Sequence, residues 1–150
     1  MNNSQRILLW IIIIVAFLGF LDATYLTVQH YLHTVPPCSA TQGCERVLTS
    51  TYATVAGIPI ALGGVIFYLA VFVLALWMMM NGLRKAILLL FGLTVIGLVT
   101  SAVLVYLQLG VLKAICLYCM GSAISTILLF VLVLLLFLKA RTKPEPSEKA

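Results

Sequence analysis

Four long apolar segments dominate this chain, and their lengths limit the folds that it can adopt. The clearest covers residues 58–80 and contains no charged side chain. At about 1.5 Å per residue, a helix of this length crosses the roughly 30 Å hydrocarbon core of a bilayer. Similar segments cover residues 7–28, 86–109 and 116–138, in which Asp22 is the only charged side chain. The pattern predicts an all-α fold, an integral membrane bundle of four helices.

The composition supports a membrane protein and argues against a nucleic-acid-binding one. Hydrophobic residues make up 63% of the chain and charged residues only 9%, whereas soluble domains carry roughly 25% charged residues. The net charge of +5 comes from basic residues near the ends of the apolar segments, where they set membrane topology. A secretory signal peptide is the alternative for the first segment. No small-x-small cleavage site follows it, so an uncleaved helix is expected.

The remaining segments are short. Residues 29–57 are polar and contain Pro36-Pro37, which stops a helix, so we expect an outer loop with a short interfacial helix within residues 45–56. Residues 81–85 form a polar turn, and a break is expected around residues 110–114. We therefore expect one membrane domain, residues 1–138, followed by a disordered cytoplasmic tail, residues 139–150.

The basic residues also predict which way the helices cross the membrane. With four spans, the two termini and the 81–85 turn lie on one side, which carries seven Lys and Arg residues against two on the other, Arg46 and Lys113. The positive-inside rule then places both termini in the cytoplasm. All four cysteines fall on the extracytoplasmic side of the cell (inner) membrane, where disulfides persist.

The cysteines form two pairs at this outer surface. Cys38 and Cys44 lie in the outer loop, and Cys116 and Cys119 stand at the start of the fourth segment. Exchange requires a thiolate to attack a disulfide directly, so a mobile pair beside a fixed pair indicates a redox relay. A helix N-terminus favours a thiolate, and Lys113 is expected to add to this effect. Two structural disulfides and a metal site that includes His30 and His33 are the alternatives; no metal is expected.

Two further features each have a structural and a functional interpretation. Asp22 is either a functional buried carboxylate or an interfacial one. The aromatic residues Phe67, Tyr68, Phe72 and Trp77 either face lipid or the core, or some of them line a pocket for a flat ring. A quinone from the bilayer is a chemically plausible electron acceptor for a membrane dithiol.

Several motifs together resemble the vitamin K epoxide reductase family, in its small bacterial form without a fused thioredoxin-like domain. They are Cys38-x5-Cys44, the following 45–50 segment Glu-Arg-Val-Leu-Thr-Ser, Gly57-Ile-Pro59, Ile66-Phe-Tyr68 and Cys116-Leu-Tyr-Cys119. The resemblance covers about residues 7–138, and the order and spacing of the two cysteine pairs are its specific part.

The resemblance implies a thiol oxidoreductase with a quinone of the ubiquinone, menaquinone or vitamin K type as electron acceptor. Cys119 would lie next to the quinone, Cys116 would be attacked by or bridged to Cys44, and Cys38 would exchange with an external thiol protein. The residues expected around the quinone are Val47, Leu48, Ser50, Phe67 and Tyr68. Relatives often have Tyr four residues after the second active-site cysteine, where this chain has Ala123. The resting disulfide, 44–116 or 38–44, stays open.

The implied partner is a separate exported thioredoxin-like protein of the DsbA kind, and the implied role is disulfide bond formation. A DsbB-like oxidase performs the same chemistry, but its Cys-x-x-Cys lies in the first outer loop and here it opens the last helix. The alternative from another class is a small tetraspan transporter or assembly subunit with structural cysteines. That alternative needs polar residues within the spans, where Asp22 stands alone among charged side chains.

Overall fold

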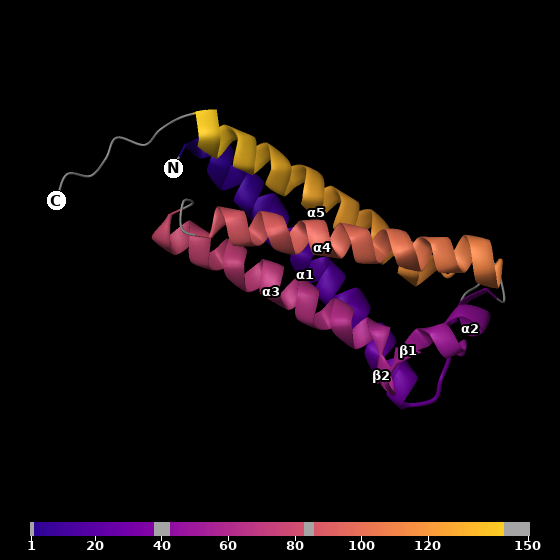
Figure 1. Cartoon of the computed structure of the whole chain (residues 1–150). Helices are drawn as coiled ribbons and strands as arrows, with labels where there is room; N and C mark the ends of the chain where they lie inside the picture. Colours follow the sequence, from indigo (N-terminus) through magenta and orange to yellow (C-terminus); the bar gives the residue numbers. More distant parts are fainter. Residues whose placement is uncertain (1, 38–42, 83–85, 143–150) are drawn as a thin grey trace.

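The fold is an all-α bundle of four long helices, as the apolar segments predict. The computed structural model describes residues 2–37, 43–82 and 86–142. The long helices are α1 (Asn3–Tyr31), α3 (Ile60–Asn81), α4 (Ile87–Tyr106) and α5 (Leu117–Thr142) (Figure 1). By length and composition, α1, α3, α5 and the continuous helical stretch Ile87–Leu112 can each cross a membrane.

Two of these helices are longer than the apolar segments that predict them. At the start of α1, the Gln5 side chain accepts a hydrogen bond from the Asn2 backbone N–H at 3.0 Å. Lys139 of α5 donates to the Ser4 hydroxyl, and the Arg141 guanidinium lies 5.4 Å from the centre of the Phe137 ring. These polar contacts extend α5 to Thr142, so the segment 139–142, expected to belong to the tail, is helical. Residues 143–150 lie outside the described residues.

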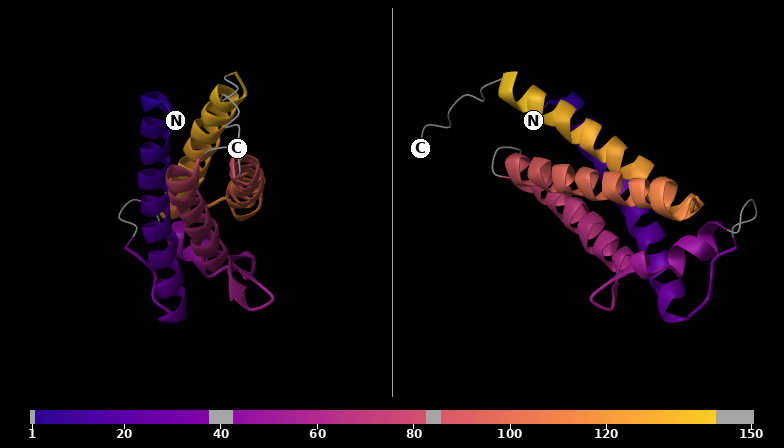
Figure 2. Two further views of the ribbon diagram at one scale, coloured as in Figure 1. Left: turned by 90° about the vertical axis from the view of Figure 1, so that its left-hand side faces the viewer. Right: turned by 45° about the vertical axis from the view of Figure 1, so that its right-hand side comes forward.

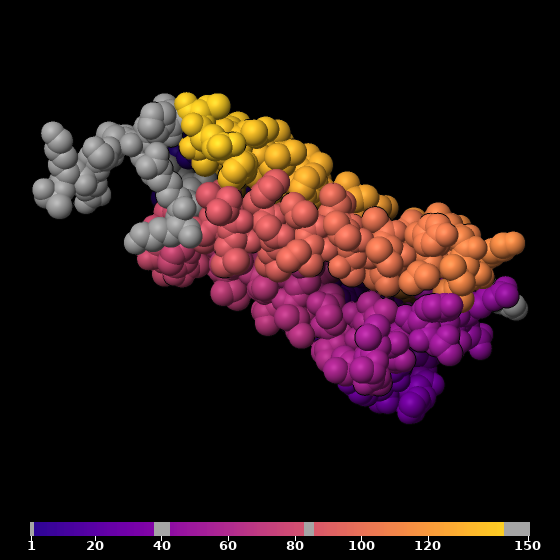
Figure 3. Space-filling view, viewed as in Figure 1, coloured from indigo at the N-terminus to yellow at the C-terminus, as the bar shows by residue number. Residues whose placement is uncertain are grey.

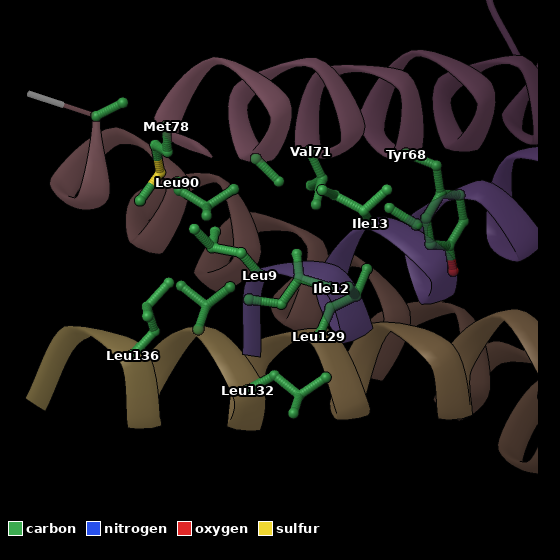
Figure 4. Packing of buried hydrophobic residues seen from close by; sticks show 14 of the residues in the cluster. Leu9, Ile12, Ile13, Tyr68, Val71, Met78, Leu90, Leu129, Leu132 and Leu136 are labelled. Atoms are coloured by element: carbon green, nitrogen blue, oxygen red, sulfur yellow. The ribbon is translucent and has the colours of Figure 1, made fainter. Parts of the chain in front are cut away.

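A continuous apolar core joins the helices away from the cysteines (Figure 4). It includes Leu9 and Ile12 of α1, Leu90 of α4, and Leu129 and Leu136 of α5, which are fully buried. Helices approach closely where glycines face aromatic rings: a Cβ on Gly19 would lie 2.3 Å from the Tyr68 ring, and one on Gly97 would lie 2.4 Å from the Phe67 ring. Small residues therefore allow α3 to pack against both α1 and α4.

The two ends of the bundle differ. The start of α1 and the end of α5 lie at one end, and the described part of the outer segment between α1 and α3 lies at the other, beside the start of α5 (Figures 1 and 2). This outer segment contains α2 (Gly43–Leu48), a 3₁₀-helix η1 (Thr51–Ala53) and a hairpin of β1 (Thr54–Val55) and β2 (Ile58–Pro59). In Figure 3 it packs against the end of the α4 stretch.

The outer segment departs from the single short helix expected within residues 45–56. The helix α2 begins at Gly43 and ends at Leu48, and the chain then forms the hairpin. The hairpin turn has φ of 53° at Ala56 and 80° at Gly57, and positive φ at both central residues is the signature of a tight two-residue hairpin. The glycine makes this turn accessible, and the turn prevents the helix from reaching residue 56.

The break expected around residues 110–114 begins later than predicted. The chain continues from α4 as a π-helix, η3 (Leu107–Leu112), and turns only at Lys113, which has φ of 48°. π-Helical turns are rare and often occur at functional sites. Here the π-helix and the turn at Lys113 lead directly into the short segment that contains Cys116.

Candidate active site

Three of the four cysteines are within the described residues, and their chemical states differ. Cys44 of α2 is disulfide-bonded, whereas Cys116 and Cys119 are free thiols. Cys38, expected to exchange with an external thiol, lies outside the described residues. Because Cys116 is free, the bond of Cys44 is not to Cys116 in this structure.

The three cysteines gather in a small buried cluster separate from the main core. Cys44, Val47, Ala114 and Cys116 form its centre, and Cys119 packs against it together with Leu48, Leu112 and Tyr118. Cys44 and Cys116 are both completely buried, whereas Cys119 is partly exposed. The fold therefore brings one member of the outer pair beside the inner pair, as a relay requires.

A glycine allows α2 to lie against the segment that precedes Cys116. A Cβ on Gly43 would lie 2.3 Å from the Ile115 carbonyl oxygen and 3.0 Å from its nitrogen. No side chain fits at these distances, and the neighbouring atoms belong to backbone that cannot rotate away. Gly43 and Ile115 each precede a cysteine in the chain, so this close backbone contact fixes Cys44 next to Cys116.

Gln108 holds the segment 113–116 from the other side. Its backbone carbonyl accepts the Ala114 N–H at 3.0 Å, and its side-chain Oε1 accepts the Cys116 N–H at 3.2 Å. Gln108 is only 4% exposed, and a buried polar group is costly unless it is hydrogen-bonded. The Gln108 backbone carbonyl also accepts the Lys113 N–H, so one residue of the π-helix satisfies three backbone donors and positions Cys116.

Cys116 stands immediately before α5, and its sulfur caps that helix. The Cys119 N–H donates to the Cys116 Sγ at 3.4 Å, while the Met120 N–H donates to the Cys116 carbonyl at 2.9 Å. A hydrogen bond with the Cys119 thiol, helped by the backbone N–H groups of Cys119 and Tyr118, lowers the pKa of Cys116 from 9.0 to about 7 despite burial. The lowered pKa therefore falls on Cys116, and its main cause is the neighbouring Cys119 thiol, with a smaller contribution from the backbone N–H groups at the start of α5.

Lys113 lies at an outer cavity, just before the inner cysteines. This cavity, of about 580 Å³, lies between α2 and the segment 113–115. Glu45, Arg46 and Thr49 of the outer segment line the same cavity. The cavity therefore adjoins the residues next to Cys44 and presents both acidic and basic groups.

A buried hydroxyl cluster lies one turn deeper than Cys119. The Tyr68 hydroxyl is 2.8 Å from the Ser122 carbonyl oxygen, 2.9 Å from the Ser122 Oγ and 3.0 Å from the Thr126 Oγ1. Tyr68 is only 1% exposed and reaches from α3 toward α5 (Figure 4). On α5, Cys119, Ser122 and Thr126 are spaced by three and four residues and share one face, so the hydroxyls continue the face that carries the thiol.

The residues expected around a quinone fall into two groups in the structure. Val47 and Leu48 lie in the cysteine cluster. Phe67 packs at the edge of the main core against Gly97, and its ring centre lies 5.1 Å from that of Tyr68. Ser50 uses its hydroxyl to donate to the Val47 carbonyl at 2.7 Å, which ends α2.

Within residues 2–37, 43–82 and 86–142, no three His, Cys, Asp or Glu side chains are grouped so as to hold a metal ion.

Sequence reasoning missed Gly43, Gln108, Ser122 and Thr126. Gln108 is an amide within an apolar segment, eight residues before Cys116, and this unusual placement was a usable signal. Ser122 and Thr126 follow Cys119 at helical spacing and could have been found in the same way. Gly43 gives no such signal, because its role depends on a contact with Ile115 that is distant in sequence.

Comparison with protein families gives a match over most of the chain. The family model described as "Vitamin K epoxide reductase family" matches residues 10–134, which include all four cysteines and all four long helices' central parts. A search of curated proteins finds no match to the chain.

Proposed function

The chain belongs to the vitamin K epoxide reductase family, and from this premise we propose that it is a thiol:quinone oxidoreductase that reoxidises an exported thioredoxin-like protein. Membership already implies a multi-pass membrane thiol–disulfide oxidoreductase. The observation that carries the finer proposal is the buried cluster in which disulfide-bonded Cys44 lies beside the free thiols Cys116 and Cys119.

The first step takes place at the outer cavity. A thiolate of the partner attacks the disulfide formed by Cys44, for which Cys38 is the proposed second member, and a mixed disulfide forms. The second partner thiol then resolves it, so that the partner leaves oxidised and the outer pair is left as two thiols. The cavity beside Cys44 carries Glu45, Arg46 and Lys113, and these charges offer a polar docking surface for a DsbA-like protein.

The second step moves the electron pair inward. With the inner pair oxidised, the Cys44 thiolate attacks the Cys116 sulfur and releases Cys119 as a thiolate. The outer thiol, proposed as Cys38, then displaces Cys116, which restores the outer disulfide and leaves the inner pair reduced. Burial of Cys44 and Cys116 in one cluster supports Cys116 as the point of attack. The oxidised outer and reduced inner cysteines of the structure correspond to the end of this step.

The third step reduces the quinone. The two inner thiols lose two electrons and two protons and form the Cys116–Cys119 disulfide, and the quinone becomes the quinol. Cys119 is the more accessible inner thiol, and we propose Val47, Leu48, Ser50, Phe67 and Tyr68 as the surrounding residues. Because Ala123 cannot donate a hydrogen bond from its side chain, we propose the Tyr68 and Ser122 hydroxyls as polar groups near the quinone. The quinone is of the ubiquinone, menaquinone or vitamin K type.

The proposed topology places both termini in the cytoplasm and the cysteines outside the cell (inner) membrane. The start of α1 and the end of α5 lie at the end of the bundle opposite to α2 and the start of α5 (Figure 1), so one membrane can separate these two ends. A disulfide relay needs its outer pair on the oxidising side, and a lipid-soluble quinone reaches the inner pair from the bilayer.

The Cys119→Ala variant tests the proposal. Purified protein in detergent receives a dithiol and a short-chain quinone without oxygen, and quinone reduction is followed by absorbance. We expect turnover in the wild type and none in Cys119→Ala, because the inner disulfide can no longer form. Ser125→Ala is the matched control on α5, since its hydroxyl donates only within the helix to the Gly121 carbonyl. Normal turnover in Cys119→Ala would overturn the proposal.

A further inference from the structure

Asp22 lies on α1 at the depth of the inner cysteines. One turn before it, Gly19 faces the Tyr68 ring, whose hydroxyl bonds to Ser122 of α5. One turn after it, the Tyr25 ring centre lies 5.6 Å from that of Tyr118. The helices α1 and α5 run in opposite directions (Figure 1), so these two contacts bracket Asp22. Asp22 is therefore level with the residues of α5 between Tyr118 and Ser122, which include Cys119.

The carboxylate of Asp22 lacks the partners that a structural role would supply. Its Oδ2 is buried and has no hydrogen-bond partner among the described residues. A carboxylate within a membrane bundle is costly, and such groups are normally paired or functional.

The groups around Asp22 can all supply a proton. The carboxylate interacts electrostatically with the thiols Cys116 and Cys119 and with the phenols Tyr68 and Tyr118. Two of these are the thiols that must lose protons when the inner disulfide forms. Bulk water has little access to an apolar bundle and is a poor acceptor for those protons there. A fixed carboxylate close to the thiols can accept them as a general base.

We propose that Asp22 is the proton acceptor for the inner dithiol during quinone reduction. This inference rests on the proposed function. As Cys119 becomes a thiolate, its proton passes to the Asp22 carboxylate, directly or through one water. The dithiol then gives its electron pair to the quinone and closes the Cys116–Cys119 bond. The proton held by Asp22 and the second thiol proton complete the quinol, so that two electrons and two protons leave the thiols and arrive at the quinone.

The experiment compares Asp22→Asn, Asp22→Glu and the control Thr24→Val in the dithiol:quinone assay. Asparagine keeps the shape of the side chain but cannot take up the proton. We expect kcat to fall by about 100-fold or more in Asp22→Asn, in the range of general acid–base effects, with KM for quinone within about twofold. Asp22→Glu should recover much of kcat. Thr24 lies on the same helix and donates to the Phe20 carbonyl at 2.7 Å, and Thr24→Val should behave as wild type.

A second measurement separates this inference from the proposed function. Without quinone, a single turnover of disulfide exchange with an oxidised inner pair needs no proton transfer through Asp22, so its rate should be unchanged in Asp22→Asn. An active wild type with equal kcat in Asp22→Asn overturns the inference alone. A raised KM with unchanged kcat in Asp22→Asn also overturns the inference. If Asp22→Asn and Asp22→Glu both lose activity and disulfide exchange is slowed as well, Asp22 has a structural role and the inference is again overturned. An inactive wild type overturns the proposed function itself.

Discussion

The two ends of this molecule differ in the regularity of their backbone. The end with the start of α1 and the end of α5 consists of long regular helices whose fully buried aliphatic side chains pack together. The cysteine end is built from short irregular pieces, namely α2, η1, a two-residue hairpin and a π-helix. Regular helices bury apolar surface efficiently, whereas irregular backbone can bring a few reactive side chains, here the cysteines, close to one another. Stability should therefore depend on the first region and reaction rate on the second.

The largest expected effect on stability comes from the core. Leu129 is fully buried in the main cluster, and Leu129→Ala removes contacts and leaves a cavity. We expect a loss of about 2–5 kcal/mol of unfolding free energy, measured by denaturation in detergent. Quinone reduction per folded molecule should stay within about twofold. A loss of turnover as large as that of a cysteine variant would show that the two regions are not independent.

At the contact between α2 and the segment before Cys116, a substitution should reduce stability less than Leu129→Ala does but should slow the reaction more. In Gly43→Ala the new Cβ would overlap the Ile115 carbonyl oxygen, 2.3 Å away, so α2 must shift and carry Cys44 with it. We expect a loss of about 1–3 kcal/mol, typical of overpacking, and a roughly tenfold slower exchange between the cysteine pairs.

Gly63→Ala is the control for this prediction, because a Cβ there meets nothing within 4 Å. Stopped-flow trapping of the mixed disulfide measures the exchange rate. Wild-type exchange in Gly43→Ala would show that this contact does not set the distance between the pairs.

The smallest expected effect is a change in the pH at which the Cys116 thiol loses its proton. Because the pKa of Cys116 is lowered from 9.0 to about 7, its thiolate should form as the pH rises through about 7 and should predominate above it. The ultraviolet absorbance of the thiolate, with Cys116→Ser subtracted, follows this change. The hydrogen bond with the Cys119 thiol is the main cause of the lowered pKa, so the midpoint should rise in Cys119→Ala. An unchanged midpoint in that variant would assign the activation to the helix start alone.

The sequence could predict the four helices and the cysteine pairs for a simple reason. Membrane spans follow from the local content of apolar residues, and the spacing of Cys116 and Cys119 defines a shared helix face by itself. The resemblance to the family is likewise confirmed by the match over residues 10–134. These features need no knowledge of distant contacts.

The features that escaped prediction depend on contacts between segments. The π-helix and its last turn are fixed by Gln108, which bonds to Ala114 and Cys116 only when the chain folds back. The cluster of Tyr68, Ser122 and Thr126 joins two helices that are far apart in sequence. No local pattern specifies these pairings.

The sulfur cap of α5 has a thermodynamic consequence for the direction of electron flow. Hydrogen bonds to the Cys116 sulfur favour its thiolate, and a thiolate exists only when the inner pair is reduced. Stabilising the reduced form raises the reduction potential of a dithiol–disulfide couple. The first turn of α5 therefore makes the inner cysteines a stronger oxidant than an uncapped pair would be. In the proposed relay, this favours transfer of electrons from the outer pair to the inner pair, and the proposed final acceptor must be more oxidising still.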